Sequence, residues 1–234
     1  MILENYYRIH QNRILVSRQQ ASDFAKQVAN DYNPIHDVDS KRFCVPGDLL
    51  FSLVLKHYGL CQHMCFRFSG MVGDSVQLIF PETNAPELTI SGDNGKEYLH
   101  LQRSGDCTPD QQVIEKLIKV YAAFSGHAFP HLLVPMMEEH QVMINPDRPL
   151  IIYESMELHL NRLALQEPSL DLAGTSLEVK GKRGKVALHF TFRDGEETVG
   201  EGTKKMVLSG LRPFDAERME ELVAGYNHRM TGYD

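Results

Sequence analysis

The sequence predicts an α+β protein in which two antiparallel sheets each wrap around a central helix. The segment Leu49–Leu55 is apolar on nearly every side of a helix, which is typical of a helix enclosed by other structure. The order of helix, loop, second helix and antiparallel strands also occurs twice along the chain. A curved antiparallel sheet wrapped around such a helix buries it on all sides.

Composition restricts the class of protein and its partners. The chain has 234 residues, 42% of them hydrophobic, and a formal net charge of −7, because 31 acidic residues outnumber 24 basic ones. This acidic balance argues against nucleic-acid or anionic-membrane partners. The segment Met1–Arg13 lacks the apolar core of a secretory signal, and no apolar run reaches the ~20 residues that span a bilayer. Four cysteines do not form a disulfide framework, so we expect reduced thiols and a cytoplasmic protein.

The first half of the chain, residues 1–108, predicts two helices and several strands. Ser22 is the expected N-cap of a helix over residues 23–29, and Pro34 ends that segment. The enclosed helix follows Pro46-Gly47. The expected strands cover residues 12–16, 64–68, 76–80, 88–91 and 98–102. Residues 104–111 are polar and rich in turn formers, which predicts a linker.

The second half, residues 109–212, repeats this order. Its helices are predicted at Val113–Phe124 and His131–His140, and the loop Ser125–Pro130 lies between them. The strands are predicted over residues 150–160, 170–180, 185–193 and 199–208. The remaining region, residues 213–234, contains an amphipathic helix at 213–230 that we expect to pack on the body or on a partner.

The chemistry is concentrated in one loop. Asp31 and His36 are five residues apart, just before the enclosed helix, so a carboxylate and an imidazole can face one another across a pocket and activate a water. Pro34 stiffens the loop, and Asn33 can bond neighbouring backbone. The alternative is a helix-ending turn in which Asp31 accepts backbone N–H bonds and His36 only packs.

The run Asp31-x-Asn33-Pro34-Ile35-His36 resembles the signature of the MaoC-like (R)-specific enoyl-CoA hydratases, over roughly residues 20–60. The resemblance implies the hotdog fold, so that two halves would make a double hotdog. It also implies water addition to a trans-2-enoyl thioester, with Asp31 and His36 activating the water. Gly47 occupies the place of the family's glycine, whose N–H binds the thioester oxygen at a helix start, where the dipole is positive.

The chain departs from the family pattern around these residues. Asn30 stands where the family usually has glycine, and Pro46 and Asp48 flank Gly47 where the family has histidine and methionine. The carboxylate of Asp48 either caps the helix or points into the pocket, where it would repel an enolate. Two alternatives therefore stay open: a non-catalytic acyl-thioester-binding protein and an acyl-CoA thioesterase.

The expected substrate is a thioester of coenzyme A or of an acyl-carrier protein. We expect Asn33, Lys41, Arg42 and Asp48 to bind it, with Lys41 and Arg42 at the phosphates. A predicted hairpin is rich in basic residues: Lys180, Lys182, Arg183 and Lys185. It either binds the phosphates of coenzyme A or the acidic face of a carrier protein, or it is simply a solvated turn.

We predict no cofactor and no metal ion. The spacing of His57, Cys61 and Cys65 would suit zinc only if one helix continued past Gly59. In the second half, Gly126 and His131 repeat the spacing of Asp31 and His36 without a carboxylate, which predicts a degenerate site that accommodates the acyl chain; alternatively, His127 and His131 are incidental loop residues. A homodimer is expected because hotdog proteins commonly pair their sheets.

Overall fold

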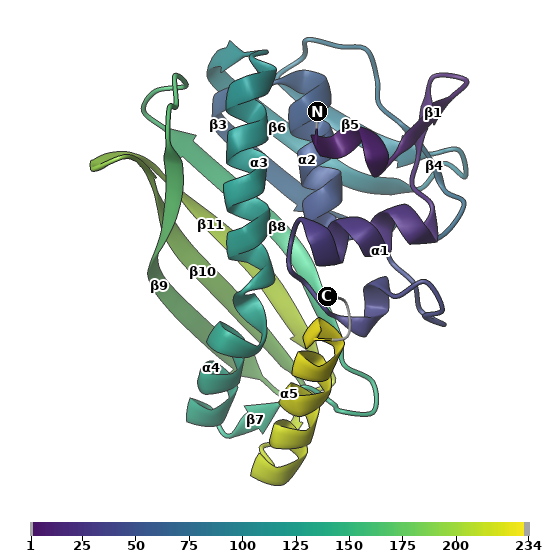
Figure 1. Ribbon diagram of the computed structural model, residues 1–234, viewed down its shortest axis with the longest axis vertical. Coiled ribbons are helices and arrows are strands. Elements are labelled where there is room, and N and C mark those ends of the chain that lie inside the picture. Colours follow the sequence, from purple (N-terminus) through teal and green to yellow (C-terminus); the bar gives the residue numbers. More distant parts are fainter. Residues whose placement is uncertain (1, 232–234) are drawn as a thin grey trace.

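The structure, a computed structural model, describes residues 2–231 and is built on one ten-stranded antiparallel sheet. Its strand order is β1-β2-β4-β5-β6-β3-β8-β11-β10-β9. Figure 1 shows the long helices on one side of this curved sheet. The expectation of two separate sheets is wrong, because β3 and β8 pair along residues 63–67 and 155–159 and join the halves. The strands at the junction are buried on their helix side, so an unpaired edge there would leave backbone N–H and C=O groups without hydrogen-bond partners.

The strands fall into two groups that meet at β3 and β8. The first half supplies β1 (Arg8–His10), β2 (Arg13–Leu15), β3 (Leu60–Phe68), β4 (Gln77–Ile79), β5 (Glu87–Gly92) and β6 (Glu97–Thr108). The second half supplies β8 (Ile151–Leu160), β9 (Pro168–Lys180), β10 (Arg183–Asp194) and β11 (Glu197–Ser209). A small second sheet pairs β7 (Val142–Met143) with β12 (Arg212–Pro213). The predicted linker at 104–111 is shorter than expected, because β6 continues to Thr108.

Five α-helices and three short helical turns complete the described chain. The helices are α1 (Arg18–Gln27), α2 (Gly47–Tyr58), α3 (Gln111–Gly126), α4 (Leu133–Glu139) and α5 (Ala216–Thr231). The turns are η1 (Ile2–Asn5), η2 (Pro34–His36) and η3 (Ala128–Leu132). Ser17, not Ser22, is the N-cap of α1: it forms a capping box with Gln20, whereas Ser22 is buried within the helix. None of the helices within residues 2–231 combines the length and the hydropathy that a membrane-spanning helix needs.

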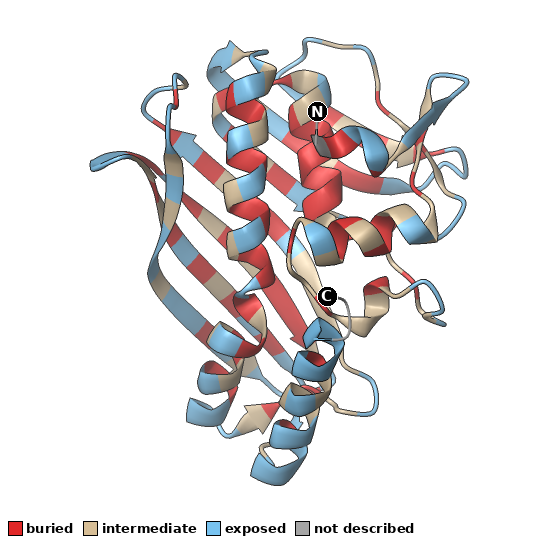
Figure 2. Ribbon diagram, viewed as in Figure 1, coloured by how far each residue is buried: buried red, intermediate tan, exposed pale blue. Residues whose placement is uncertain are grey.

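The enclosed helix is α2, as the sequence predicts. Its residues 48–55 are all buried, and Figure 2 shows the helix red along this length. Phe51 lies between Phe66 of β3 and Tyr121 of α3, with ring centroids 4.8 and 4.5 Å away. The apolar helix therefore lies between the antiparallel sheet on one side and α3 on the other.

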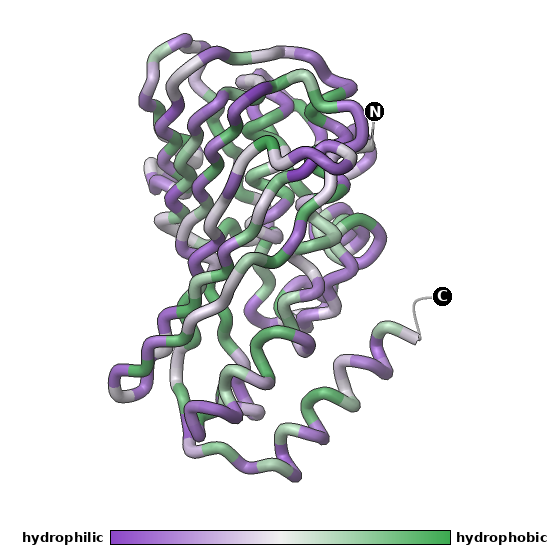
Figure 3. Tube along the Cα trace, turned by 90° about the vertical axis from the view of Figure 1, so that its left-hand side faces the viewer, coloured by the Kyte–Doolittle hydropathy of each residue, from purple (hydrophilic) through white to green (hydrophobic). Residues whose placement is uncertain are grey.

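The second half uses its helices differently from the first. The long helix α3 packs beside α2 in the main core, where it buries Ile114, Leu117, Ile118 and Tyr121. The helix expected at His131–His140 is the short α4, which sits over a separate apolar cluster near the end of the sheet. The first half therefore keeps a fully enclosed helix, whereas α4 is only partly covered. Figure 3 shows α5 set apart from the sheet, and its residues Met219 and Tyr226 are buried against the rest of the molecule.

The cysteines correct one expectation. Cys61 and Cys107 face each other on β3 and β6 and form a disulfide, so the prediction of reduced thiols is wrong for this pair. Cys44 and Cys65 are free thiols. Burial raises the pKa of the Cys44 thiol to about 11, which keeps it protonated at neutral pH. A zinc site at His57, Cys61 and Cys65 does not form, because Cys61 is consumed by the disulfide and lies in a strand.

We expect replacement of Phe51 by alanine to lower the free energy of unfolding by about 3–5 kcal/mol, because it removes a ring from the centre of the core. The control is Val38→Ala, at a residue that is 41% exposed, which should change it by less than about 0.5 kcal/mol. Urea unfolding measures both values. Equal losses for the two variants would contradict the placement of α2 at the centre of the core.

Candidate functional site

The motif loop has a defined backbone conformation after α1. Asn30 has a φ of 54°, in the left-handed region that glycine and asparagine adopt most readily. This geometry accounts for asparagine at the position where the hydratase pattern has glycine. The N–H of Asp31 then donates to the Ala25 carbonyl at 2.7 Å. Asn33 caps η2 by accepting from the Ile35 N–H at 3.2 Å, and Pro34 is its first residue.

The side chains of Asp31 and His36 face each other. Asp31 Oδ2 lies 3.6 Å from His36 Nε2, and Asp31 Oδ1 accepts the Asn33 N–H at 2.9 Å. His36 Nδ1 lies 2.7 Å from the Cys44 carbonyl oxygen, which can only accept. Nδ1 therefore carries a hydrogen, and in the neutral ring Nε2 presents its lone pair toward Asp31. The imidazole is thus oriented as a base next to a carboxylate.

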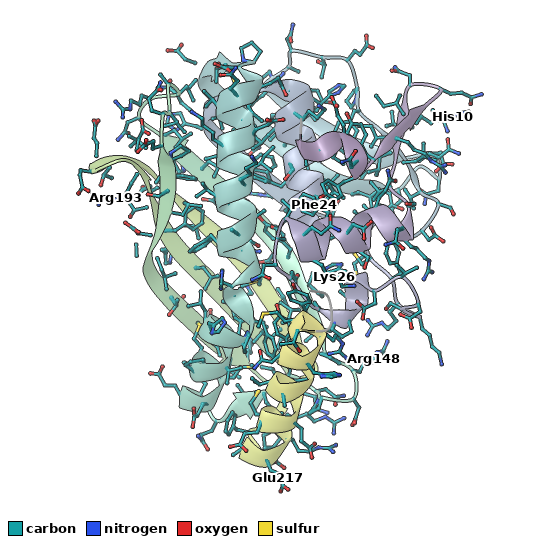
Figure 4. All side chains as sticks on the ribbon, viewed as in Figure 1. His10, Phe24, Lys26, Arg148, Arg193 and Glu217 are labelled. Atoms are coloured by element: carbon teal, nitrogen blue, oxygen red, sulfur yellow. A yellow bond between two sulfur atoms is a disulfide. The ribbon has the colours of Figure 1, made fainter. Side chains whose placement is uncertain are left out.

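Further contacts fix the loop on both sides. Lys26 of α1 bonds Asp37 Oδ1 at 2.7 Å, directly after His36; Figure 4 labels Lys26 at the end of α1 next to this segment. At Gly126 of α3, an added Cβ would lie 1.6 Å from the Ala29 carbonyl oxygen, so only glycine permits this approach of helix to loop. Gly126 thus supports the motif loop sterically.

The start of α2 lies on the same cavity. Its N-cap is Pro46, which has no side-chain group that could bond the helix's first N–H groups. Gly47 follows, and a Cβ there would lie 2.5 Å from Tyr153 Cδ1, so the Tyr153 ring packs directly on the glycine. Glycine is therefore the residue that allows the ring this close to the start of the helix, on the lining of the cavity. Amide hydrogens at the positive end of a helix bind oxygen atoms that carry negative charge.

A cavity of about 500 Å³ joins these groups. The motif loop and the start of α2 form one wall. The part of the lining that comes from the second half is largely apolar: it includes Phe129, Leu133, Ile144, Ile151 and Met206. Helix α5 adds Leu222, Tyr226 and Arg229. A cavity whose lining is largely apolar and includes a few polar groups suits a ligand with a reactive polar head and a hydrocarbon chain.

Asp48 forms a buried polar cluster with the second half of the chain. Its Oδ2 accepts from Ser125 Oγ at 2.5 Å, and its Oδ1 lies 3.5 Å from Lys204 Nζ. Lys204 also donates to Ser125 Oγ. Asp48 is therefore neither the helix N-cap nor an unpaired carboxylate in the pocket. The sequence-based alternatives for Asp48 missed this pairing because both partners lie far away along the chain.

Two tyrosines close the cluster. Their hydroxyl groups, on Tyr121 of α3 and Tyr153 of β8, bond each other. Burial, and then the neighbouring negative groups, raises the pKa of both tyrosines well above the ordinary value, so both stay protonated. Lys204 Nζ lies 4.2 Å from the centre of the Tyr153 ring. The ammonium group is thus held by a carboxylate, a hydroxyl and a ring face.

Tyr226 connects α5 to the motif loop. Its hydroxyl accepts the Tyr32 N–H at 3.1 Å and donates to the Asn30 carbonyl at 3.4 Å, so it bonds the residues on both sides of Asp31. Its ring also contacts Phe129 at a centroid distance of 5.2 Å. Burial, and then the charge of Asp31, raises the pKa of Tyr226. Helix α5 therefore contributes to the lining of the cavity. It packs on the body of the protein, which is one of the two arrangements expected from the sequence.

The structure places only some of the remaining predicted residues on the cavity. Asn33 and Asp48 line it, but Lys41 and Arg42 lie outside its lining. The basic hairpin also lies outside the lining; it comprises Lys180, Lys182, Arg183 and Lys185. His127 and His131 are exposed, with ring centroids 5.7 Å apart, and do not line the cavity. Among the described residues, the cationic groups on the lining are Lys204 and Arg229, apart from the imidazole of His36.

Sequence reasoning missed Ser125, Tyr153, Lys204 and Arg229. One signal for Lys204 exists: it shares the inward-facing side of β11 with Gly202 and Met206, where a charged residue is unusual. Ser125 and Tyr153 carry no comparable signal, because serine at a helix end and tyrosine in a strand are common. Arg229 lies on the terminal helix, whose position depends on tertiary packing.

Because Asn30 has a positive φ, we expect Asn30→Gly to retain wild-type stability and Asn30→Val to lose about 1–3 kcal/mol. A β-branched side chain is strained in this conformation, whereas glycine is not. Urea unfolding of the two variants measures the difference. A valine variant as stable as the glycine variant would contradict the loop conformation.

Comparisons with solved structures give distant likenesses at 10% sequence identity. One is a MaoC-like dehydratase, with 86% of this chain and 97% of that chain covered and a TM-score of 0.42. A second is a tesB protein of Mycobacterium avium subspecies paratuberculosis, with 88% of this chain and 96% of that chain covered and a TM-score of 0.44. A third is the acyl-CoA thioesterase II TesB2 of Mycobacterium marinum, with 92% of this chain and 98% of that chain covered and a TM-score of 0.43.

A search of curated proteins finds no match. One protein-family model matches residues 1–217, which is most of the chain and ends within the first turn of α5. Its description is DUF3581, a protein of unknown function. The chain belongs to the DUF3581 family.

Proposed function

We propose that the protein adds water to a trans-2-enoyl thioester, with Asp31 and His36 as the acid–base pair. One observation carries this proposal: a carboxylate and the lone pair of an imidazole face each other at 3.6 Å on the wall of a largely apolar cavity. The resemblance of the motif to the hydratase signature agrees with it. The pair lies too far apart for a good direct hydrogen bond, and a water that donates to both groups would fit their chemistry.

In the proposed step, this water attacks carbon 3 of the enoyl group. His36 Nε2 accepts the proton of the water as the new C–O bond forms, and Asp31 orients the water and stabilises the imidazolium. The electron pair of the double bond moves to the thioester oxygen to give an enolate. The protonated His36 then delivers this proton to carbon 2, which completes the 3-hydroxyacyl thioester. His36 thereby returns to its neutral form.

The enolate oxygen would be held by the N–H of Gly47 at the start of α2, where the helix dipole favours negative charge. The apolar residues of the lining would take the acyl chain. Lys41 and Arg42 lie outside the lining, so we assign the phosphate contact of coenzyme A or of a carrier to Arg229. Asn33 would serve the reaction by shaping the loop.

This proposal treats the chain as a double hotdog. Residues 1–108 would carry the chemistry, residues 109–212 would accommodate the acyl chain, and the extension 213–234 would cover the cavity. Residues 1 and 232–234 lie outside the described residues. The homodimer stays a prediction that light scattering can test against the 26.6 kDa of one chain.

The test is loss of enoyl absorbance with crotonyl-CoA and longer enoyl-CoA substrates. We expect Asp31→Asn and His36→Gln each to lower kcat by about 10²–10⁴-fold, because each removes one partner of the acid–base pair. His131→Gln, at an exposed histidine outside the cavity, is the matched control and should keep the wild-type rate.

A free-thiol assay run beside it separates the alternatives. Release of thiol without hydration would indicate a thioesterase. If neither signal exceeds that of an Asp31→Ala variant, while acyl-CoA still raises the melting temperature, the protein binds acyl thioesters without turnover.

We expect Tyr226→Phe to lower kcat with little change in KM. The substitution removes the hydroxyl that bonds both neighbours of Asp31, whereas the ring and its contacts are kept. A loss of about 3- to 30-fold corresponds to one or two hydrogen bonds of about 1 kcal/mol each. Tyr58→Phe, which removes a hydroxyl bonded to the Pro81 carbonyl outside the cavity, is the control. An equal effect of the two substitutions would refute a role of Tyr226 in the site.

A further inference from the structure

A buried lysine on the cavity wall has no part in the water-adding step. The Lys204 side chain is 6% exposed, whereas that of Lys205, the next residue of β11, is 45% exposed and pairs with Glu157. An ammonium group taken out of water is destabilising unless other groups replace its hydration. The position therefore raises the question of what the charge does there.

The partners of Lys204 come from the elements that meet at the cavity. Asp48 is the second residue of α2, and Ser125 is the penultimate residue of α3. The Asp48 side chain is 9% exposed, and its Oδ1 accepts no hydrogen bond within residues 2–231, so it depends on the 3.5 Å ion pair with Lys204 for compensation. The ammonium is thus the positive charge that balances a buried carboxylate.

The ring of Tyr153 contacts both Lys204 and Gly47. Tyr153 packs directly on Gly47, and Lys204 Nζ lies 4.2 Å from the centre of that ring. The carboxylate of Asp48 also belongs to the residue that directly follows Gly47. Without a counter-charge, it would repel an oxygen that becomes negative at Gly47, and the repulsion is strong where water is excluded.

We propose that Lys204 is a positioning residue that neutralises Asp48 and, together with Ser125, holds the first turn of α2 so that it can bind a thioester enolate. The inference rests on the proposed function in taking the thioester oxygen to lie at Gly47. It requires no water addition, so it can be tested apart from the hydratase activity. It also accounts for an acidic residue beside the oxyanion site: the carboxylate anchors the lysine across the two halves.

The probe is acetoacetyl-CoA, a 3-oxoacyl thioester whose enolate absorbs in the near ultraviolet. The wild-type protein should bind part of it as the enolate. Lys204→Met keeps the length of the side chain and removes the charge, and should lower the enolate fraction at least about tenfold, toward the 10²–10³-fold effect of losing an oxyanion donor. Lys205→Met, on the opposite face of the same strand, should leave it unchanged.

The decisive variant is the double substitution Asp48→Asn with Lys204→Met, which removes both charges together. It should recover most of the enolate fraction that Lys204→Met loses. If the double variant is no better than Lys204→Met, or if Lys204→Met behaves like the wild type, the proposal is overturned. Thermal melting of each variant, with and without acetoacetyl-CoA, confirms folding and binding.

Two further outcomes are also informative. If Lys204→Met does not fold, Asp48→Asn alone decides: with the carboxylate gone and the ammonium kept, the enolate fraction should equal or exceed that of the wild type, and a tenfold fall refutes the inference. If the wild type binds the probe with no enolate band, or does not bind it, the inference also fails. An enolate band that responds as expected, in a protein that hydrates no enoyl-CoA, removes the proposed function and supports the role of Lys204.

Discussion

The burial of α2 is the constraint on which the rest of the structure depends. A helix that is apolar on nearly all sides is unstable in water, so a sheet must cover one side and another helix the other. Strands of the first half cover one side, and α3 covers part of the other. The N-terminus of α2 is where this cover ends. The cavity, Gly47 and the carboxylate of Asp48 all lie at that point.

The polar groups at the cavity follow from where α2 begins. Since the helix start is surrounded by protein, each charge there needs a partner from another element. Lys204 and Ser125 meet Asp48 from β11 and α3, and the hydroxyls of two tyrosines bond each other. Removing one member would leave a buried group unpaired, which costs more than the interaction itself contributes. The two halves are therefore joined by a continuous sheet outside and by a charged cluster inside.

The motif loop shows how local and distant contacts combine. Its backbone is fixed by its own sequence: a left-handed Asn30, a capping Asn33 and a proline at the first turn of η2. Its side chains are fixed from outside, by the Cys44 carbonyl that sets the tautomer of His36 and by Tyr226 on both sides of Asp31. Such double support is what a catalytic pair needs, because small displacements weaken proton transfer.

The sequence by itself determined what depends on near neighbours along the chain: the enclosed helix at residues 49–55, most of the strands, and the turn that brings Asp31 to His36. These follow from periodicity, capping and proline geometry, which act over a few residues. Only the tertiary structure decided that the halves share one sheet, that Cys61 bonds Cys107, that α3 lies beside α2, and that Lys204 balances Asp48. The partners in these contacts are 46 residues apart or more, as for Cys61 and Cys107, so no local pattern records them. The free energy of burying α2 selects them by closing the chain around it.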